Sequence, residues 1–149
     1  MTVAACPLCD GVGGALVYQG DKYRVIRAEE RDFPAFYRLV WTAHVAEFSD
    51  LDRADRHLCM EAVNVVERVL RTQLEPTKIN LASLGNVVPH LHWHVIARFE
   101  WDTHFPAPVW ALPKRPADQV RLEGLNAKLT VVEQTMIAEL TLFGQTSMD

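Results

Sequence analysis

The sequence predicts an α+β fold in which an antiparallel β-sheet packs against helices. Segments with strand character follow one another along the chain, and helical segments do not alternate with them in the regular order of a parallel sheet. Size agrees with this class, because 149 residues with 49% hydrophobic side chains suffice for one buried core. We therefore expect residues 1–149 to form a single domain without an internal linker or repeat.

The first predicted strands form a hairpin over residues 16–27. β-favouring residues lie on both sides of Gln19-Gly20-Asp21, which is typical of a hairpin turn. Before this hairpin, the three glycines within residues 11–14 indicate a turn and argue against a helix. A third strand is predicted over residues 37–41.

The middle of the chain predicts one long helix and two further strands. Asp52 is a suitable helix N-cap, apolar residues recur at helical spacing to about Leu74, and Pro76 ends the pattern. Strands are expected over residues 78–84 and 87–99, because each run is apolar and the second alternates clearly.

The last third of the chain has a different character. Residues 100–116 are rich in Trp, Pro and His, which predicts an irregular loop. Apolar residues then recur at helical spacing over residues 118–143. We expect a C-terminal helix there.

Charge and hydropathy exclude several kinds of partner. The net charge is −4, and the Lys and Arg residues are scattered, which argues against a nucleic acid polymer. No stretch approaches the roughly 18 apolar residues of a membrane span. The N-terminus lacks the basic start and apolar stretch of a signal peptide, and the chain has only three cysteines. These features predict a reducing, cytoplasmic setting.

Three histidines alternate with apolar residues in the strand predicted over residues 87–99. Residues i, i+2 and i+4 of a strand share one face, so His90, His92 and His94 should project together. The outer two Cα atoms would lie about 13 Å apart, so three imidazoles of one straight strand hardly converge on one ion. A neutral imidazole is a competent nucleophile near pH 7. We expect the central His92 to attack a phosphate and His94 to act as the neighbouring donor.

Two cysteines near the N-terminus have the spacing of a metal knuckle. Cys6-Pro-Leu-Cys9 supplies two thiolates, and zinc normally takes four ligands, so the others must come from Cys59 and the six histidines. A redox pair would need a helix N-terminus, which the following glycines argue against. A structural zinc site is the leading interpretation, and an empty thiol pair or a redox pair are the others. We expect Cys59 itself to be a core residue.

Several motifs together resemble one family. His90-Leu-His92-Trp-His94-Val-Ile96 resembles the His-φ-His-φ-His-φ-φ signature of the histidine triad (HIT) nucleotide hydrolases and transferases. Residues 79–86 resemble that family's Asn-containing strand and Gly-Gln turn, and residues 37–51 resemble its strand, Pro-Lys-x-His loop and Asp-Leu helix entry. Cys6-Pro-Leu-Cys9 resembles the zinc knuckle of many bacterial members. The resemblance covers residues 6–99 and does not extend over residues 100–149.

The resemblance implies both a fold and an activity. The fold is a HIT-like α+β domain whose sheet extends across a homodimer. His92 would form a nucleotidyl-histidine intermediate, and His94 would assist the leaving group or bridging oxygen. Asn80 and Asn86 would lie near the ribose and phosphate. The substrate would be a dinucleoside polyphosphate or a nucleoside phosphoramidate, and the bacterial zinc-knuckle type resembles the dinucleoside polyphosphate hydrolases.

The resemblance also implies how zinc would be held. His44 and His90 would complete the ligand set begun by Cys6 and Cys9. His90 would then anchor its strand, leaving His92 for the chemistry. A zinc-dependent enzyme that uses the three histidines as catalytic ligands is an alternative from another class.

Departures from the family pattern leave a second alternative open. Asn86 stands where the family usually has Gln, and Val87 where many members have a Ser or Thr that donates to phosphate. Without that hydroxyl, the chain could be a nucleotide-binding module with little or no catalysis. No acidic residue aligns with a ribose-binding position of the family, and Glu29 and Glu30 are candidates for that contact by their place in the sequence alone.

The aromatic residues of the loop over 100–116 have two interpretations. Trp101, Phe105 and Trp110 could stack on a nucleobase. The simpler interpretation is that they pack this loop onto the domain.

Overall fold

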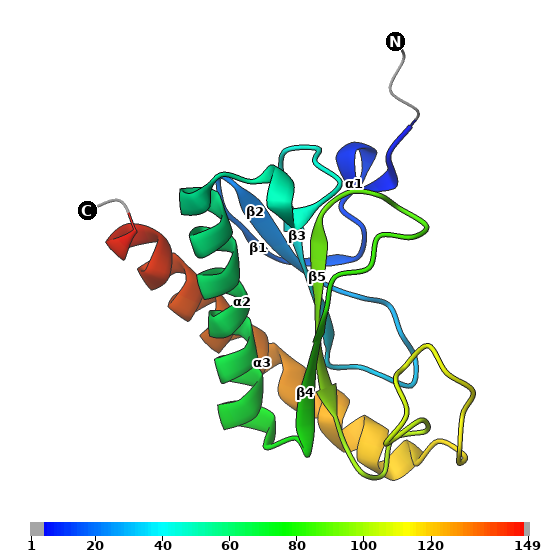
Figure 1. The fold of residues 1–149 in the computed structure, drawn as a ribbon. Helices are drawn as coiled ribbons and strands as arrows, with labels where there is room; N and C mark the ends of the chain where they lie inside the picture. The colour runs from blue at the N-terminus through cyan, green and yellow to red at the C-terminus, as the bar shows by residue number, and fades with distance from the viewer. Residues whose placement is uncertain (1–4, 148–149) are drawn as a thin grey trace.

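The computed structural model describes residues 5–147, in which five antiparallel strands form one sheet. The order is β1-β2-β3-β5-β4, so the third and fifth strands are neighbours at its centre (Figure 1). The strands are β1 (Ala15–Gln19), β2 (Tyr23–Arg27), β3 (Phe36–Trp41), β4 (Lys78–Ala82) and β5 (His92–Arg98). This confirms the predicted class of fold.

Two long helices cover one face of the sheet, as Figure 1 shows: α2 (Arg53–Leu74) and α3 (Gln119–Thr146). The Asp52 carboxylate caps α2 by accepting from the Asp55 amide. Inward-facing strand residues and the apolar stripes of both helices form one large core. The members of this core include Val25, Leu39 and Val95 of the strands, Val66 and Leu70 of α2, and Met136 and Leu140 of α3. Full burial of one such aliphatic side chain contributes about 1.5–3 kcal/mol to the stability of the fold.

The opposite face of the sheet carries polar groups between two small apolar clusters. Register places Val40 opposite His92 and Arg38 opposite His94, so these four side chains share this face. One cluster joins Cys6 and Leu8 to the sheet. The other contains Phe36 and Ile96, farther along the strands. His92 and His94 therefore lie between these two apolar clusters.

Several predicted boundaries were wrong, and one error matters for function. β5 begins at His92, whereas a strand over residues 87–99 was expected. The segment before it cannot continue the ladder, because Pro89 has no amide proton and Gly85 adopts a φ of 74°. His90 therefore does not belong to the strand, and its amide donates to the carbonyl of Val88. The expectation that three histidines alternate on one strand holds for two of them.

The N-terminal prediction also needs correction. A one-turn helix, α1 (Pro7–Asp10), stands where the glycines argued against any helix. Pro7 at the first position favours this turn, and the glycines begin only after it ends. A second short helical turn, η1 (Phe48–Asp50), precedes α2.

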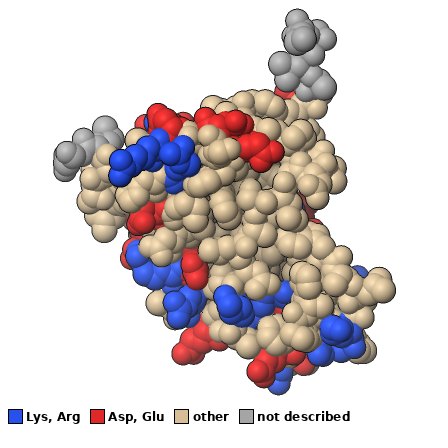
Figure 2. Space-filling model, viewed as in Figure 1, with Lys and Arg blue, Asp and Glu red and all other residues tan. Residues whose placement is uncertain are grey.

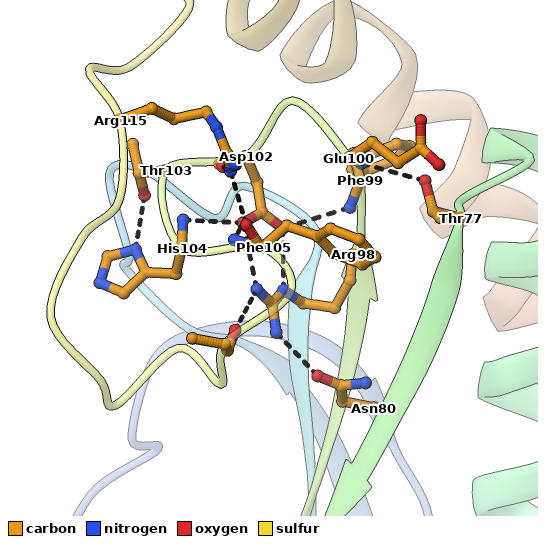
Figure 3. Close-up of polar contacts among 11 residues, drawn as sticks. Thr77, Asn80, Arg98, Phe99, Glu100, Asp102, Thr103, His104, Phe105 and Arg115 are labelled. Carbon is orange, nitrogen blue, oxygen red and sulfur yellow. Dashed lines mark hydrogen bonds and ion pairs between the residues drawn. The ribbon is translucent and has the colours of Figure 1, made fainter.

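The loop after β5 is fixed by a buried ion pair (Figure 3). Arg98 donates to Asp102 at 2.8 Å through Nε and at 3.1 Å through Nη2. The same guanidinium reaches the Asn80 amide oxygen at 2.8 Å and the Ala107 carbonyl at 2.7 Å. Arg115 donates to the carbonyl of Asp102 at 2.6 Å. Residues 99–118 thus have a defined path although they contain no helix or strand.

Surface charge is mixed on the face drawn in Figure 2. Lys and Arg side chains do not gather into one large basic patch, and acidic side chains lie between them. Within residues 5–147, no helix combines the length and the apolar character that a membrane crossing requires.

Candidate active site and metal centre

His92 and His94 lie side by side at the centre of the sheet. Their ring centroids are 4.9 Å apart and the rings are nearly perpendicular, at 86°. His94 is only 5% exposed, whereas His92 is half-buried. Strand alternation therefore brings these two predicted residues together.

Backbone contacts fix which nitrogen of His92 carries its proton. Nδ1 lies 2.6 Å from the carbonyl oxygen of His90. A carbonyl can only accept, so Nδ1 must hold the proton and the lone pair lies on Nε2. Burial lowers the pKa of His92, and the Arg38 charge adds to this, against the opposing effect of the His90 carbonyl. A neutral imidazole with a free Nε2 is the form that can act as a nucleophile.

Arg38 fixes the opposite tautomer on His94. Its Nε donates to Nδ1 of His94 at 3.3 Å. A guanidinium cannot accept, so Nδ1 of His94 is the acceptor and its proton resides on Nε2. Burial, with the neighbouring His92 and Arg38, lowers the pKa of His94 to about 3. His94 is therefore a neutral hydrogen-bond donor at pH 7.

Both histidines line a cleft of about 600 Å³. The α1 turn forms one wall, the loop before β5 another, and Trp110 a third. Trp110 is 52% exposed, and its ring centroid lies 5.2 Å from that of His94. The lining residues are Pro7, Leu8, Gly13, Arg38, Leu84, Gly85, Asn86, Val87, Val88, His92, His94 and Trp110.

A separate cluster of two thiols and two imidazoles lies beside this cleft. The four ligand atoms of Cys6, Cys9, His44 and His90 lie within 4.8 Å of one another. The Sγ atom of Cys9 is 3.3 Å from Nδ1 of His44 and 3.4 Å from Nδ1 of His90. A tetrahedral zinc ion would place such ligands about 3.3–3.8 Å apart. The donor set and its spacing therefore fit zinc.

Neighbouring groups already orient this cluster. Nε2 of His90 lies 2.6 Å from the Trp41 carbonyl, so the proton is held there and Nδ1 is free to bind a metal. Arg24 donates to the carbonyls of Leu8 and Gly11, which holds the α1 turn against the sheet. Leu8 and Gly11 flank Cys9, so Arg24 fixes the backbone that presents this thiol.

The other residues predicted from the sequence differ in whether they reach the cleft. Asn86 lines the cleft, whereas the side chain of Asn80 accepts from Arg98 in the network of Figure 3. Glu29 and Glu30 are exposed and do not line the cleft. Cys59 is a fully buried core residue, as expected.

The three loop aromatics divide between the two interpretations. Trp101 stacks on Phe99 with centroids 5.0 Å apart, and Phe105 lies beside Arg98. These two pack the loop onto the domain. Trp110 instead faces the cleft.

Arg38 is the functional candidate that sequence reasoning missed. It stands in a predicted strand among apolar residues, a position that also suits a solvent-facing side chain. Its proximity to His94 depends on the pairing of β3 with β5, which no local pattern reveals.

The HIT domain family model matches residues 12–101. The chain belongs to the HIT family. A search of curated protein sequences found no match. Among solved structures, a histidine triad protein of Bradyrhizobium japonicum is 28% identical, with a TM-score of 0.65, over 80% of this chain and 90% of the other. A histidine triad (HIT) protein of Sinorhizobium meliloti is 27% identical, with a TM-score of 0.66, over 87% and 96%.

These two structures match this HIT chain over most of its length and over nearly all of their own. A histidine triad protein of Marinobacter aquaeolei, at 23% identity and a TM-score of 0.66, shares the fold over 84% of this chain. The matched regions exceed the span of the family model, so the HIT fold recognised here includes part of the sequence outside residues 12–101.

Proposed function

We propose that this HIT protein is a nucleotide hydrolase or nucleotidyl transferase that works through a covalent intermediate on His92. The observation that carries this is the 2.6 Å contact from Nδ1 of His92 to the His90 carbonyl, which leaves the Nε2 lone pair free at the cleft. The candidate substrates are dinucleoside polyphosphates and nucleoside phosphoramidates.

The first step forms a bond from Nε2 of His92 to the α-phosphorus. The bond from phosphorus to the leaving group breaks, and its electron pair departs with that group. A phosphate leaves as its anion, whereas the nitrogen of a phosphoramidate also takes up a proton from solvent and leaves as an amine. Positive charge develops on the His92 ring and is stabilised by the carbonyl that accepts from Nδ1. The Nε2–H of His94 donates a hydrogen bond to the bridging or departing atom.

The second step releases the nucleotide. Water, or another acceptor in a transferase, attacks the phosphorus, and the phosphorus–nitrogen bond breaks. The electron pair returns to Nε2 of His92, which restores the free base, and the proton of the water passes to solvent. Asn86 lines the same cleft and is proposed to contact the nucleotide, as is Asn80 once it exchanges its contact with Arg98.

Zinc belongs to this proposal as a structural ion. Cys6, Cys9, His44 and His90 would hold it, and it would crosslink the α1 turn to the segment that enters β5. His90 also supplies the carbonyl that orients His92, so the metal centre would stabilise the position of that carbonyl. Pairing of two copies through an edge of the sheet is part of the same proposal, with β4 as an available edge strand.

Turnover of a substrate panel tests the function. Diadenosine polyphosphates and adenosine phosphoramidate would be offered to the wild type and to His92→Ala, with the products separated by chromatography. We expect release of AMP by the wild type and a loss of at least about a thousandfold in His92→Ala. Full activity in His92→Ala would overturn the proposal.

One observation favours a second candidate, a binding module with little catalysis. Val87 is 93% exposed at the cleft and offers no hydroxyl to a phosphate. Calorimetry that detects nucleotide binding by wild-type protein, without any product, would favour this alternative.

A further inference from the structure

His94 is enclosed by three side chains that lie outside the histidine triad. The Phe36 ring meets it edge-on with centroids 5.4 Å apart, and Trp110 lies 5.2 Å away. Arg38 Nε donates to its Nδ1 at 3.3 Å. Two of these neighbours, Arg38 and Trp110, also line the cleft.

Arg38 brings a positive charge that no carboxylate in the described part of the chain neutralises. Among residues 5–147, no Asp or Glu oxygen lies within 4.0 Å of its guanidinium nitrogens, and Glu30 acts on it only at longer range. Its hydrogen bond to His94 uses Nε, which leaves the two terminal nitrogens without a partner in the same residues. A half-buried guanidinium with free terminal N–H groups is suited to an anion, phosphate above all.

Trp110 brings an exposed aromatic face to the same side of the cleft. The loop that carries it is held by the Arg98–Asp102 pair and by Arg115, so its exposure does not reflect a loose segment. A planar base can stack on such a ring. Leu112, two residues later in the loop, is 85% exposed and does not line the cleft.

The protonation of His94 restricts what can leave beside it. Because Nδ1 accepts from Arg38, His94 is neutral and donates a hydrogen bond without giving up a full proton. A departing phosphate is stable as an anion and needs only that hydrogen bond. A departing amine needs a proton, and the Arg38 charge repels its cationic form.

We propose that Arg38 and Trp110 form a leaving-group subsite that selects an anionic group carrying an aromatic ring, such as a second nucleotide, over an amine. This rests on the proposed function, because His94 marks the leaving-group side only if His92 is the nucleophile. Arg38 also supplies a contact to phosphate in place of the Ser or Thr hydroxyl that many family members have at the position of Val87.

Three adenylyl donors separate the two contributions. Diadenosine triphosphate has a leaving group with charge and ring, ATP cleaved to pyrophosphate has charge alone, and adenosine phosphoramidate has neither. We expect Arg38→Gln to lower kcat/KM about 10- to 100-fold more on the first two donors than on the third, because all donors share the hydrogen bond of Arg38 to His94 and only the first two have an anionic leaving group. Arg38→Lys should recover part of the loss, since it keeps the charge. Trp110→Ala should lower kcat/KM about 5- to 20-fold on diadenosine triphosphate alone.

Matched controls and the third donor keep the result interpretable. Arg71→Gln removes an exposed charge on α2, and Leu112→Ala removes an exposed apolar side chain from the Trp110 loop, so neither should alter the ranking of donors. Circular dichroism and thermal unfolding of each variant show that it is folded. Equal losses on all three donors would overturn the proposal, because Arg38 would then act only by positioning His94. If His92→Ala keeps its activity, the proposed function itself has failed.

Discussion

Replacing Asp102 by Asn should destabilise the protein strongly although the change is nearly isosteric. Asp102 is 4% exposed and accepts two hydrogen bonds from Arg98 and three from the amides of Phe99, His104 and Phe105. Every one of these partners is a donor. Asn offers a single acceptor oxygen, so its NH₂ group would face N–H groups, and Arg98 would lose its counter-charge.

The magnitude follows from the burial of the pair. Removing one member of a buried ion pair typically costs about 3–5 kcal/mol. For a chain of this length, each kcal/mol lowers Tm by roughly 2–4 °C, so Tm should fall by about 6–20 °C. Thermal and urea unfolding followed by circular dichroism would measure the change.

A matched control comes from an exposed ion pair. Glu139 pairs with Arg68 at 2.9 Å, with their side chains 41% and 52% exposed, so Glu139→Gln should cost less than about 1 kcal/mol. Equal effects of Asp102→Asn and Glu139→Gln would refute the reasoning, because burial would then have no part in the strength of the Arg98–Asp102 pair.

Three further outcomes follow from the same structure. Burial alone would raise the pKa of Asp102, but hydrogen bonds from Arg98 and the amides hold this pKa below its usual range. The stability that the Asp102 carboxylate gives is therefore present above roughly pH 4 and is lost as the pH falls through the pKa of the folded state. Acid titration should then destabilise the wild type more than Asp102→Asn. Cys9→Ser should lose bound zinc in elemental analysis and lower Tm, and a chelator should do the same to the wild type but little to the variant. Leu140→Ala should cost about 2–5 kcal/mol while unfolding stays a single transition, because this fully buried side chain of α3 lies in the same core as the sheet; two separate transitions would contradict one domain over residues 1–149.

Local patterns in the sequence were sufficient for the class of fold and for much of the site. Alternation placed His92 and His94 on one face, and the Cys6–Cys9 spacing predicted a knuckle. The pattern could not reveal where β5 begins, because Val87 and Val88 look like strand residues although Pro89 interrupts the ladder.

Contacts distant in sequence explain what was missed. Arg38 and His94 are 56 residues apart, and they meet only because β3 pairs with β5 in one particular register. Trp110 reaches the cleft because Arg98 and Asp102 set the path of its loop. Composition alone gave Trp101 and Trp110 the same interpretation, whereas the structure packs one and exposes the other.

Peptide mapping of a trapped intermediate tests the central proposal most directly. Wild-type protein would be mixed with an adenylyl donor, quenched within the first turnovers, digested and analysed by mass spectrometry. We predict one adenylyl group per active site on His92, bound through Nε2, and none on His92→Ala. An adenylyl group on His90 or His94, or turnover of the donor with no covalent species on the wild type at any time, would contradict it.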